Sequence, residues 1–319
     1  MRVVVTGGAG FIGSNLVDLL LSQGHDVAVL DNLSTGFTEH LEGARAHGAR
    51  FALIECDLYE EPERVRDAID GADAVVHLAA NADVRFGWSA PRRDLEQNVL
   101  ATHHVLEAMR TTGVRRILFS STGSVYGETA VVPTPEDAPF PVQTSLYGAS
   151  KAAAEAYIAA YAEADIVSAS VFRFVSLLGP RYSHGHVIDF VRRLLDDPSR
   201  LQILGDGAQR KSYLHVSDCV AAVASRLDVD PKFEVLNLGT DGFCTVRDSA
   251  SWICERLGVT PTFEYTGGDR GWIGDNPYIY LDTARIQATG WTPRFEIRES
   301  IEDTVDYLRE HRWLIERTA

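Results

Sequence analysis

The sequence lacks the features that mark several classes of protein. Its apolar runs stay below the roughly 18 residues that a membrane-spanning helix needs. Its four cysteines are scattered over 319 residues without a Cys-x-x-Cys pair, which argues against a disulfide framework or a zinc site and fits a reducing cytosol. The chain opens directly on an apolar, strand-like run, so we expect no signal peptide and a cytoplasmic location.

Basic residues are few relative to acidic ones. The chain carries 30 Lys and Arg against 45 Asp and Glu, which gives a formal charge of −15. Nucleic acids and anionic membranes both require basic patches, so this charge argues against either partner. The length allows one large domain or two modest ones.

The first 31 residues predict a dinucleotide-binding βαβ unit. An apolar run, Arg2–Thr6, leads into the glycine-rich loop Gly7–Gly13, the amphipathic segment Ser14–Ser22 and a second strand, Asp26–Leu30. The glycines of such a loop allow a sharp turn, close approach to a pyrophosphate and tight packing of helix on strand. The helix N-terminus then offers free N–H groups to the phosphates. The alternative is a βαβ turn with a structural role alone.

Asp31 indicates which dinucleotide binds. It follows Gly13 by 18 residues, close to the roughly 20-residue spacing at which a carboxylate takes the adenosine ribose hydroxyls. A 2′-phosphate would be repelled by this carboxylate and needs an Arg, but Asn32–Ser34 contains no basic residue. The sequence therefore favours NAD over NADP.

Two further strands are expected to end at the same edge of the sheet. Asp57 follows Phe51–Glu55 and could bond the adenine amine, or alternatively cap a helix over Glu60–Ile69. His77 lies in the strand Ala74–Leu78, and we expect it to be packed or hydrogen-bonded rather than catalytic.

Arg85 and Asn98 come after the strand that holds His77. Arg85 is placed either to reach an anionic substrate group or to face solvent. Asn98 lies within a helix expected over Pro91–Arg110, and a buried Asn needs polar partners, which the cofactor ribose or a neighbouring loop could supply.

Tyr147 and Lys151 form a candidate catalytic pair. They follow a strand, Arg116–Ser120, and its hydroxyl-rich loop, and they begin an alanine-rich helix that extends to about Ala162. Residues four apart share one helix face. A phenol is a poor base at its usual pKa of about 10, but a nearby ammonium and a positively charged nicotinamide favour the phenolate. Tyr147 is therefore a candidate proton acceptor near neutral pH.

Together these motifs resemble the extended short-chain dehydrogenase/reductase family, and within it the UDP-galactose 4-epimerases and related nucleotide-sugar epimerases. The stretches that carry the resemblance are Thr6–Gly13, Asp31–Leu33, Asp57-Leu58, His77–Ala80, Asn98-Val99 and Tyr147–Lys151. The resemblance implies an α/β fold with a Rossmann-type doubly wound parallel sheet and a smaller mixed α/β substrate domain. We expect residues 1–174 and 214–242 to form the NAD-binding domain, and residues 175–213 and 243–319 the nucleotide-sugar-binding domain.

Three elements of the second half are also expected. Phe172–Leu178 is predicted as a sixth strand that leaves the cofactor domain, and Val235–Gly239 as a strand that returns to it. Thr304–Trp313 is predicted as the closing helix.

The resemblance also implies site residues. Tyr147 is the catalytic base, Lys151 holds the nicotinamide ribose and lowers the pKa of the tyrosine, and Thr122 bonds the sugar 4-oxygen, with Ser124 as the alternative. The residues expected to contact NAD are Gly7, Gly10, Phe11, Ile12, Gly13, Asp31, Asn32, Ser34, Thr35, Gly36, Asp57, Leu58, Leu78, Ala79, Ala80, Asn98, Ser120, Tyr147 and Lys151. The residues expected to contact the substrate are Arg85, Thr122, Tyr147, Ser176, Val187, Gln202, Leu204, Lys211, Arg270 and Asp275. Ile279 is expected to gate the size of the sugar.

The chain departs from the family pattern at several of these positions. Dehydratases and decarboxylases of the family carry a Glu two residues after the Thr, where this chain has Ser124, which argues for oxidation and re-reduction at one carbon. Ser176 stands in place of a usual Asn. Lys211 stands in place of an Arg, so it can neutralise a diphosphate without the bidentate fork. The spacing from Arg270 to Asp275 is two residues longer than usual.

The resulting prediction is a NAD-dependent 4-epimerase of a nucleotide sugar, most simply UDP-glucose and UDP-galactose. UDP-glucuronate, UDP-N-acetylhexosamine and other nucleotide sugars are alternative substrates, and Arg85 favours the uronate. A nucleotide-sugar dehydratase and a non-catalytic nucleotide-binding module are alternative functions. No metal is expected, because the two histidines of Ser183–Phe190 have no acid or Cys cluster beside them. The resemblance implies a homodimer built from the helices Pro91–Arg110 and Tyr147–Ala162.

Overall fold

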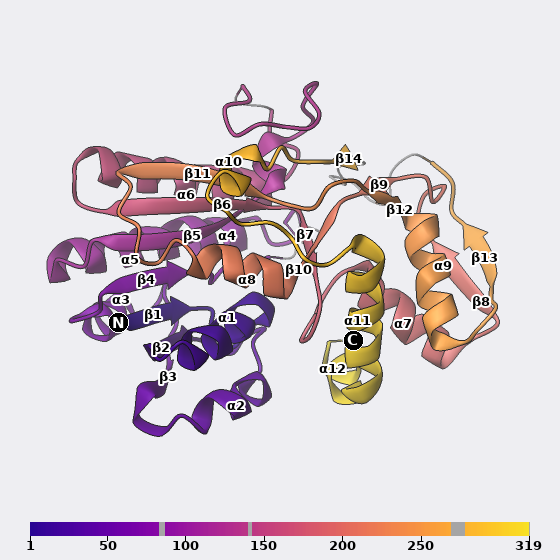
Figure 1. Ribbon diagram of the computed structural model, residues 1–319, viewed down its shortest axis with the longest axis horizontal. Helices are drawn as coiled ribbons and strands as arrows, with labels where there is room; N and C mark the ends of the chain where they lie inside the picture. Colours follow the sequence, from indigo (N-terminus) through magenta and orange to yellow (C-terminus); the bar gives the residue numbers. More distant parts are fainter. Residues whose placement is uncertain (83–86, 140–141, 269–277, 319) are drawn as a thin grey trace.

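A seven-stranded parallel sheet forms the centre of the larger part of the chain (Figure 1). The computed structural model describes residues 1–82, 87–139, 142–268 and 278–318. The strands of the sheet are β1 (Arg2–Thr6), β2 (Asp26–Asp31), β3 (Phe51–Glu55), β4 (Ala74–His77), β5 (Arg116–Thr122), β6 (Ser168–Phe174) and β11 (Phe233–Leu238). They lie in the order β11-β6-β5-β4-β1-β2-β3, and every neighbouring pair is parallel. This is the doubly wound fold that the sequence predicts, with β11 returning to it as expected.

Helices cover both faces of this sheet because its strands are apolar on both sides. Along β1, Val3 and Val5 pack into one hydrophobic core and Val4 into the other. The helices over the first core are α1 (Phe11–Ser22) and α8 (Val216–Ala224). Those over the second are α3 (Pro62–Ile69), α5 (Ala101–Thr112) and α6 (Leu146–Glu163) (Figure 1). The order of the strands reverses beside β1, and open α/β sheets bind ligands at the carboxyl ends of the strands at such a point.

The later part of the chain forms three small sheets and a group of helices beside the main sheet (Figure 1). The sheets are β7 (Ser176–Leu178) with β10 (Tyr213–His215), β8 (Arg200–Ile203) with β13 (Thr262–Tyr265), and β9 (Arg210–Lys211) between β12 (Cys244–Thr245) and β14 (Tyr278–Ile279). The helices are α7 (His186–Asp196), α9 (Val246–Leu257), α10 (Ala284–Gln287), α11 (Ile297–Glu310) and α12 (Arg312–Arg317). Helices α7, α9 and α11 pack on one another, as Figure 1 shows at the right.

Short helical segments complete the described chain. These are η1 (Thr38–Leu41), α2 (Glu42–Arg45), η2 (Gly48–Arg50), α4 (Pro91–Asp94), the π-helical η4 (Leu95–Leu100) and η5 (Gly123–Tyr126). The helix predicted over residues 91–110 is thus a continuous run of α4, η4 and α5 with a π-helical segment in its middle.

Two predicted elements differ from the structure. The strand expected over Phe172–Leu178 is two strands, because β6 ends at Phe174 and β7 pairs with β10 in a separate sheet. The closing helix begins at Ile297, before the predicted Thr304, because Glu296 and Glu299 form a capping box there. It ends at Glu310, and after His311 the short helix α12 follows.

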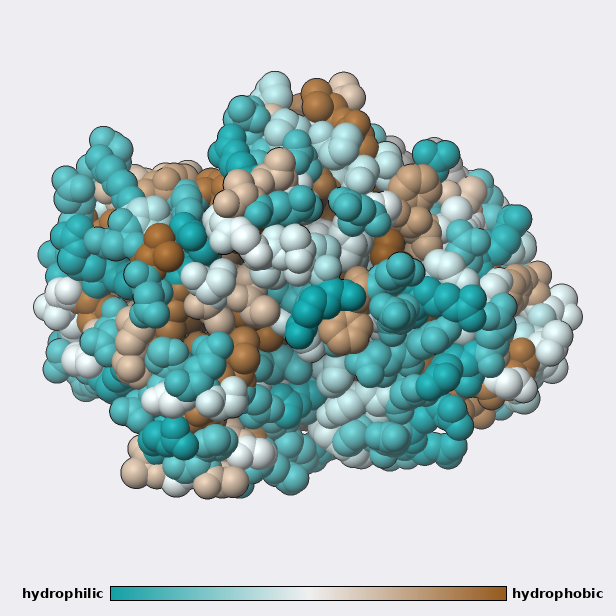
Figure 2. All heavy atoms as spheres, viewed as in Figure 1, coloured by the Kyte–Doolittle hydropathy of each residue, from teal (hydrophilic) through white to brown (hydrophobic). Residues whose placement is uncertain are grey.

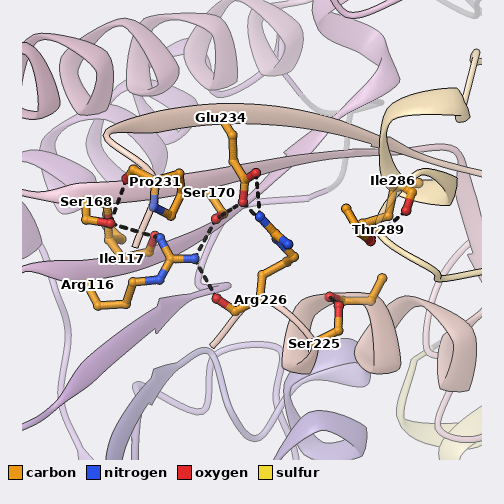
Figure 3. Close-up of polar contacts among 11 residues, drawn as sticks. Arg116, Ile117, Ser168, Ser170, Ser225, Arg226, Pro231, Glu234, Ile286 and Thr289 are labelled. Atoms are coloured by element: carbon orange, nitrogen blue, oxygen red, sulfur yellow. Dashed lines mark hydrogen bonds and ion pairs between the residues drawn. The ribbon is translucent and has the colours of Figure 1, made fainter. Parts of the chain in front are cut away.

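A buried polar cluster lies at the amino ends of β5, β6 and β11, opposite the edge that is predicted to bind ligands (Figure 3). The Arg116 guanidinium donates to the Ser168 carbonyl at 3.2 Å and to the Arg226 carbonyl at 2.7 Å. Arg226 in turn pairs with Glu234 at 2.8 Å, and Ser170 donates to the same carboxylate at 2.6 Å. Burial lowers the pKa of Arg116 to about 10. The cluster joins three strands to the segment that follows α8.

The surface is mixed in character. Hydrophilic side chains cover most of the face in Figure 2, and hydrophobic ones show in small separate patches. Of the helices within the described residues, none has both the length and the apolar composition to cross a membrane.

Candidate active site

The glycine-rich loop leaves little room for a side chain at several of its positions, of which Gly13 and Gly7 are the clearest because backbone atoms block them. A Cβ at Gly13 would lie 2.1 Å from the carbonyl oxygen of Gly7. Gly7 has a φ of +69°, and its Cβ would lie 2.7 Å from the backbone nitrogen of Ala79 at the end of β4. The loop therefore presents bare backbone at the switch point of the sheet.

The N-terminus of α1 suits an anionic ligand. Gly10 is its N-cap, and within this described helix no side chain caps the first turn and no acidic residue occupies it. The first N–H groups of a helix need external partners, and their dipole favours negative charge. These features and the glycine cradle fit the pyrophosphate of a dinucleotide.

Asp31 is already fixed beside this loop. Its carboxylate accepts hydrogen bonds from the backbone N–H of Ala9 at 2.9 Å and of Leu33 at 2.8 Å. The residue is 8% exposed, and burial raises the pKa of Asp31 while the two backbone donors oppose the shift. Gly36 passes close by, since a Cβ there would lie 3.1 Å from the carboxylate. The position agrees with the predicted role toward a ribose, which stays a prediction.

Both carboxylate oxygens of Asp57 accept hydrogen bonds from neighbouring residues. One carboxylate oxygen accepts from Asn32 Nδ2 at 2.7 Å, and the other accepts from the backbone N–H groups of Tyr59 and Glu60. Burial opposes the shift, but these hydrogen bonds lower the pKa of Asp57. The carboxylate therefore closes a turn before α3, whose N-cap is Glu61, and it also lines a pocket with Asn32, Glu55, Cys56, Glu61 and Arg64. Contact with adenine stays a prediction.

Asn98 finds its partners in a neighbouring loop. It is 1% exposed, accepts from the Asn81 backbone N–H at 2.8 Å and donates to the Asn81 carbonyl at 3.2 Å. It also donates to Ser150 Oγ on α6 at 2.8 Å. The π-helical segment η4 carries this side chain, and such segments are frequent at functional sites. Asn98 thus holds the loop after β4 against α6.

His77 is the packed, hydrogen-bonded histidine that the sequence predicts. Its Nδ1 lies 2.7 Å from Thr6 Oγ1 and its Nε2 lies 3.0 Å from Thr102 Oγ1. Burial lowers the pKa of His77 to about 3, with a smaller contribution from the charge of Lys151. The ring is neutral near pH 7.

Three side chains predicted to be catalytic come together where β5 meets α6. Thr122 ends β5, and Tyr147 and Lys151 lie in the first turns of α6, whose N-cap Ser145 accepts from the Gly148 N–H at 3.0 Å. The helix lies so close to the β5 loop that a Cβ at Gly148 would lie 3.0 Å from the Ser124 carbonyl oxygen. The Thr122 and Tyr147 side chains are near enough to interact, since Thr122 acts to lower the pKa of the Tyr147 phenol against the larger effect of burial.

Ser124, the alternative to Thr122, contacts that threonine through both its side chain and its backbone. Its Oγ is 3.2 Å from Thr122 Oγ1, and its backbone N–H donates to the same atom at 3.1 Å. Ser124 therefore orients Thr122, and Thr122 is the hydroxyl next to Tyr147.

Burial dominates the electrostatics of the catalytic pair. It raises the pKa of Tyr147 to about 12; the hydrogen bond with Thr122 opposes this shift and the charge of Asp94 adds to it. It lowers the pKa of Lys151 to about 7, and the charge of Glu155 opposes that shift. The Lys151 ammonium lies 4.2 Å from the centre of the Phe119 ring. The predicted lowering of the tyrosine pKa by Lys151 stays a prediction.

The other predicted cofactor residues surround the same edge of the sheet. Ser120 donates from Oγ to the His77 carbonyl at 3.3 Å, and Ser34 donates from Oγ to Asn32 Oδ1 at 2.7 Å. Phe11, Leu58 and Gly36 are buried, Ile12, Leu78, Ala79 and Ala80 are half-buried, and Thr35 is exposed.

The predicted substrate residues are more dispersed. Ser176, Gln202 and Leu204 are exposed and Lys211 is half-buried, whereas the Val187 side chain is fully buried in the hydrophobic core. Arg85, Arg270 and Asp275 lie outside the described residues. Ile279 packs close to the catalytic loop, since its Cγ2 would lie 3.0 Å from a Cβ at Gly123. Their roles toward a sugar nucleotide stay predictions. In the described chain, no group of three or more His, Cys, Asp or Glu residues is arranged to hold a metal ion.

The sequence reasoning missed a buried acid next to the catalytic pair. Glu155 accepts a hydrogen bond from Ser121 and forms an ion pair with Arg173 at 2.6 Å. The available signal was its position, four residues after Lys151 on a predicted helix.

Comparison with known proteins agrees with this geometry. A profile of the NAD dependent epimerase/dehydratase family matches residues 3–239. The chain is 32% identical to the UDP-glucose 4-epimerase of Mycolicibacterium smegmatis and 30% identical to a putative UDP-glucose 4-epimerase of Methanocaldococcus jannaschii. Each alignment covers 97% of this chain and 99% of the relative.

Solved structures give the same picture. A UDP-galactose 4-epimerase is similar with 37% identity and a TM-score of 0.86, over 98% of this chain and 100% of that one. The UDP-glucose 4-epimerase of Thermus thermophilus in complex with NAD has 34% identity and a TM-score of 0.85, over 97% and 99%. A dTDP-glucose 4,6-dehydratase of Streptomyces venezuelae has 26% identity and a TM-score of 0.90, over the full length of both chains. The fold is therefore shared by enzymes with different outcomes, and the site must discriminate between them.

Proposed function

Because the chain belongs to the NAD-dependent epimerase/dehydratase family, we propose that it is a nucleotide-sugar 4-epimerase acting on UDP-glucose and UDP-galactose. The observation that carries the proposal is the loop after β5. Thr122 lies beside Tyr147 and acts on the pKa of its phenol, while Gly123 and Ser124 occupy the positions where an acid would serve elimination. A loop that carries no acid at these two positions supports oxidation and re-reduction at a single carbon.

The chain's own groups have distinct tasks in this reaction. NAD, when bound, would supply the hydride acceptor for oxidation at the sugar C4 and the hydride donor for the re-reduction. Tyr147 takes the proton of the 4-hydroxyl and later returns it, and Thr122 orients the oxygen. Lys151 provides positive charge beside the phenol, which favours its ionised form. Asp31 and the N-terminus of α1 hold the cofactor in place.

Epimerisation also requires that the oxidised sugar present its other face before the proton returns. Lys211 suits this need, because an ammonium attracts a diphosphate as a point charge without fixing its orientation. Gln202 and Leu204, exposed at the end of β8 and just after it, are proposed to contact the base. A uronate is the second candidate substrate, because Arg85 follows the β4 strand in the sequence and could pair with a carboxylate.

We also propose a homodimer and a two-domain division. Leu95 and Tyr157 are 51% and 47% exposed on the η4 and α6 helices, which supports an interface there. Light scattering at micromolar concentration should give twice the mass of the chain, and a monomer would remove this claim. The proposed NAD-binding domain is 1–174 with 214–242, and the substrate domain is 175–213 with 243–319.

The test of the proposed function is a substrate panel. The purified protein with NAD is incubated with UDP-, dTDP-, GDP- and ADP-hexoses, with UDP-glucuronate and with UDP-N-acetylglucosamine, and products are identified by NMR. We expect UDP-glucose and UDP-galactose to interconvert. A 4-keto-6-deoxy product would instead indicate a dehydratase.

A further inference from the structure

Glu155 is a buried acid with a complete set of partners. It lies one helical turn after Lys151 on α6 and is 7% exposed. One oxygen accepts from the Ser121 hydroxyl, and Arg173 donates to both oxygens, from Nε at 3.1 and 3.2 Å and from a terminal nitrogen at 2.6 Å. A buried carboxylate is stable only when paired in this way, so its position is specified.

Arg173 is itself held in one orientation. It donates to the Tyr126 hydroxyl at 2.7 Å and to the Glu136 carbonyl at 3.1 Å, and its guanidinium lies 4.7 Å from the centre of the Tyr126 ring. The Tyr126 hydroxyl donates to Asn237 Oδ1 at 2.8 Å on β11. The Arg173 guanidinium therefore cannot move away from Glu155 without also breaking its contacts with Tyr126 and Glu136.

These contacts join the elements that carry the catalytic residues. Ser121 directly precedes Thr122 on β5, while Glu155 belongs to the helix that carries Tyr147 and Lys151. A single carboxylate thus fixes the end of β5 against the catalytic face of α6.

The surroundings of Lys151 make this carboxylate electrostatically important. Its ammonium faces the Phe119 ring of β5 and lies near the neutral His77 of β4, neither of which offers negative charge. Burial disfavours the ammonium, and the charge that opposes this effect comes from Glu155. On the side of Tyr147, the groups that act are the Thr122 hydroxyl and Asp94.

We propose that Glu155 is a positioning residue for the reaction: anchored by Ser121 and Arg173, its carboxylate keeps Lys151 charged inside the closed site and aligns Lys151 and Tyr147 with Thr122. The inference rests on the proposed roles of Tyr147 and Lys151, but the charge state of Lys151 can be measured without turnover.

The sequence makes that measurement direct, because it contains only three lysines, Lys151, Lys211 and Lys232. The full-length protein is labelled with [13C,15N]-lysine, and the three side-chain signals are followed by NMR against pH. The Lys151 signal is assigned as the one missing from Lys151→Arg. In Glu155→Gln we expect the Lys151 midpoint to fall by about one pH unit, the size expected when an opposite charge within a few ångströms is removed. Lys211 should not move.

Glu163→Gln is the matched control. Glu163 lies at the end of the same helix, its side chain is 83% exposed, and it pairs with Lys232 at 3.1 Å. This variant removes one charge from α6 and should leave the Lys151 midpoint unchanged. If Glu155→Gln fails to fold, Glu155→Asp retains the charge but withdraws it by one methylene, and it should give a smaller shift in the same direction.

The kinetic readout is the pH profile of kcat. Loss of a negative charge eases the loss of protons from the Tyr147–Lys151 pair, so both limbs should move to lower pH in Glu155→Gln and stay in place in Glu163→Gln. The inference is overturned if folded Glu155→Gln has the same Lys151 midpoint as the wild type. If Glu155→Gln is insoluble, the same result for folded Glu155→Asp overturns it. If Glu155→Gln shows the NMR shift but the wild type epimerises no sugar, the proposed function alone is contradicted.

Discussion

The Asp31 carboxylate accepts a hydrogen bond from the backbone N–H of Ala9, 2.9 Å away in the glycine-rich loop. The residue that we propose to bind the adenosine ribose is thereby tied to the segment that would hold the pyrophosphate. The hydrogen bond thus couples the proposed ribose site to the proposed pyrophosphate site, the two parts that would bind the ADP portion of NAD.

We predict that Asp31→Asn weakens NAD binding by at least tenfold and that Asp31→Arg weakens NAD while improving NADP. The amide keeps the size of the side chain but loses the charge that strengthens hydrogen bonds to ribose hydroxyls. Both dinucleotides are titrated against each variant by calorimetry. A wild type that prefers NADP would show that Asp31 has a different role.

Gly13→Ala should lose NAD binding or fold poorly. Its methyl group would lie 2.1 Å from the Gly7 carbonyl oxygen, so the loop must move away from its cradle. Gly43→Ala, in the short helix α2, is the control, because a Cβ there would lie 3.8 Å from the Asp18 carboxylate of α1, at ordinary contact distance. The control should bind NAD normally and gain up to about 1 kcal/mol of stability. Equal NAD affinities in the two variants would contradict the steric argument.

The polar cluster of Figure 3 predicts a stability effect without a change at the active site. Glu234→Gln leaves Arg226 without its anionic partner beside the buried Arg116, and breaking a buried pair costs about 3–5 kcal/mol. Because both partners of this pair retain some exposure, we expect about 2 kcal/mol, measured by urea unfolding. Glu163→Gln breaks an exposed pair and should cost less than about 1 kcal/mol. The KM values of a folded Glu234→Gln should equal those of the wild type.

Buried neutral histidines predict a loss of stability in acid. Burial lowers the pKa of His40 to about 4, of His77 to about 3 and of His186 to about 4. These values lie below the unfolded value of about 6.5. The unfolded chain therefore binds more protons in this window, and the free energy of unfolding falls as pH drops from about 6.5 to 4.

The measurement is urea unfolding at several pH values. His77→Gln retains hydrogen-bonding groups but cannot take up the proton. It should therefore reduce the slope of the unfolding free energy against pH by roughly 1.4 kcal/mol per pH unit, the contribution of about one proton. His184→Gln, at an exposed position, should leave the slope as it is. An identical slope in wild type and His77→Gln would mean that His77 is not the group being titrated.

The sequence predicts the sheet and the positions of Thr122, Tyr147 and Lys151 at its edge because both depend on local patterns; the catalytic roles of these residues stay predictions. The apolar run of β1, the glycine spacing and the four-residue interval from Tyr147 to Lys151 are short-range features. The parallel sheet then brings the segments that carry them to one edge. The split between β6 and β7 was missed because Ser176–Leu178 is as apolar and extended as the strand before it. Only its pairing with β10 separates the two. The Glu155–Arg173 pair was missed because its partners come from a helix and a strand that are joined only in three dimensions.

The most direct test of the account is the activity of Tyr147→Phe beside the wild type. The phenyl ring keeps the shape of the site and removes the group that accepts the 4-hydroxyl proton. General-base catalysis is worth about 10² to 10⁴ in rate. We predict that the wild type interconverts UDP-glucose and UDP-galactose, and that Tyr147→Phe loses at least a hundredfold in kcat while binding the nucleotide sugar and NAD normally. Thr122→Ala should lose less. A Tyr147→Phe variant that retains most of its activity, or a wild type that epimerises no nucleotide sugar, would contradict the account.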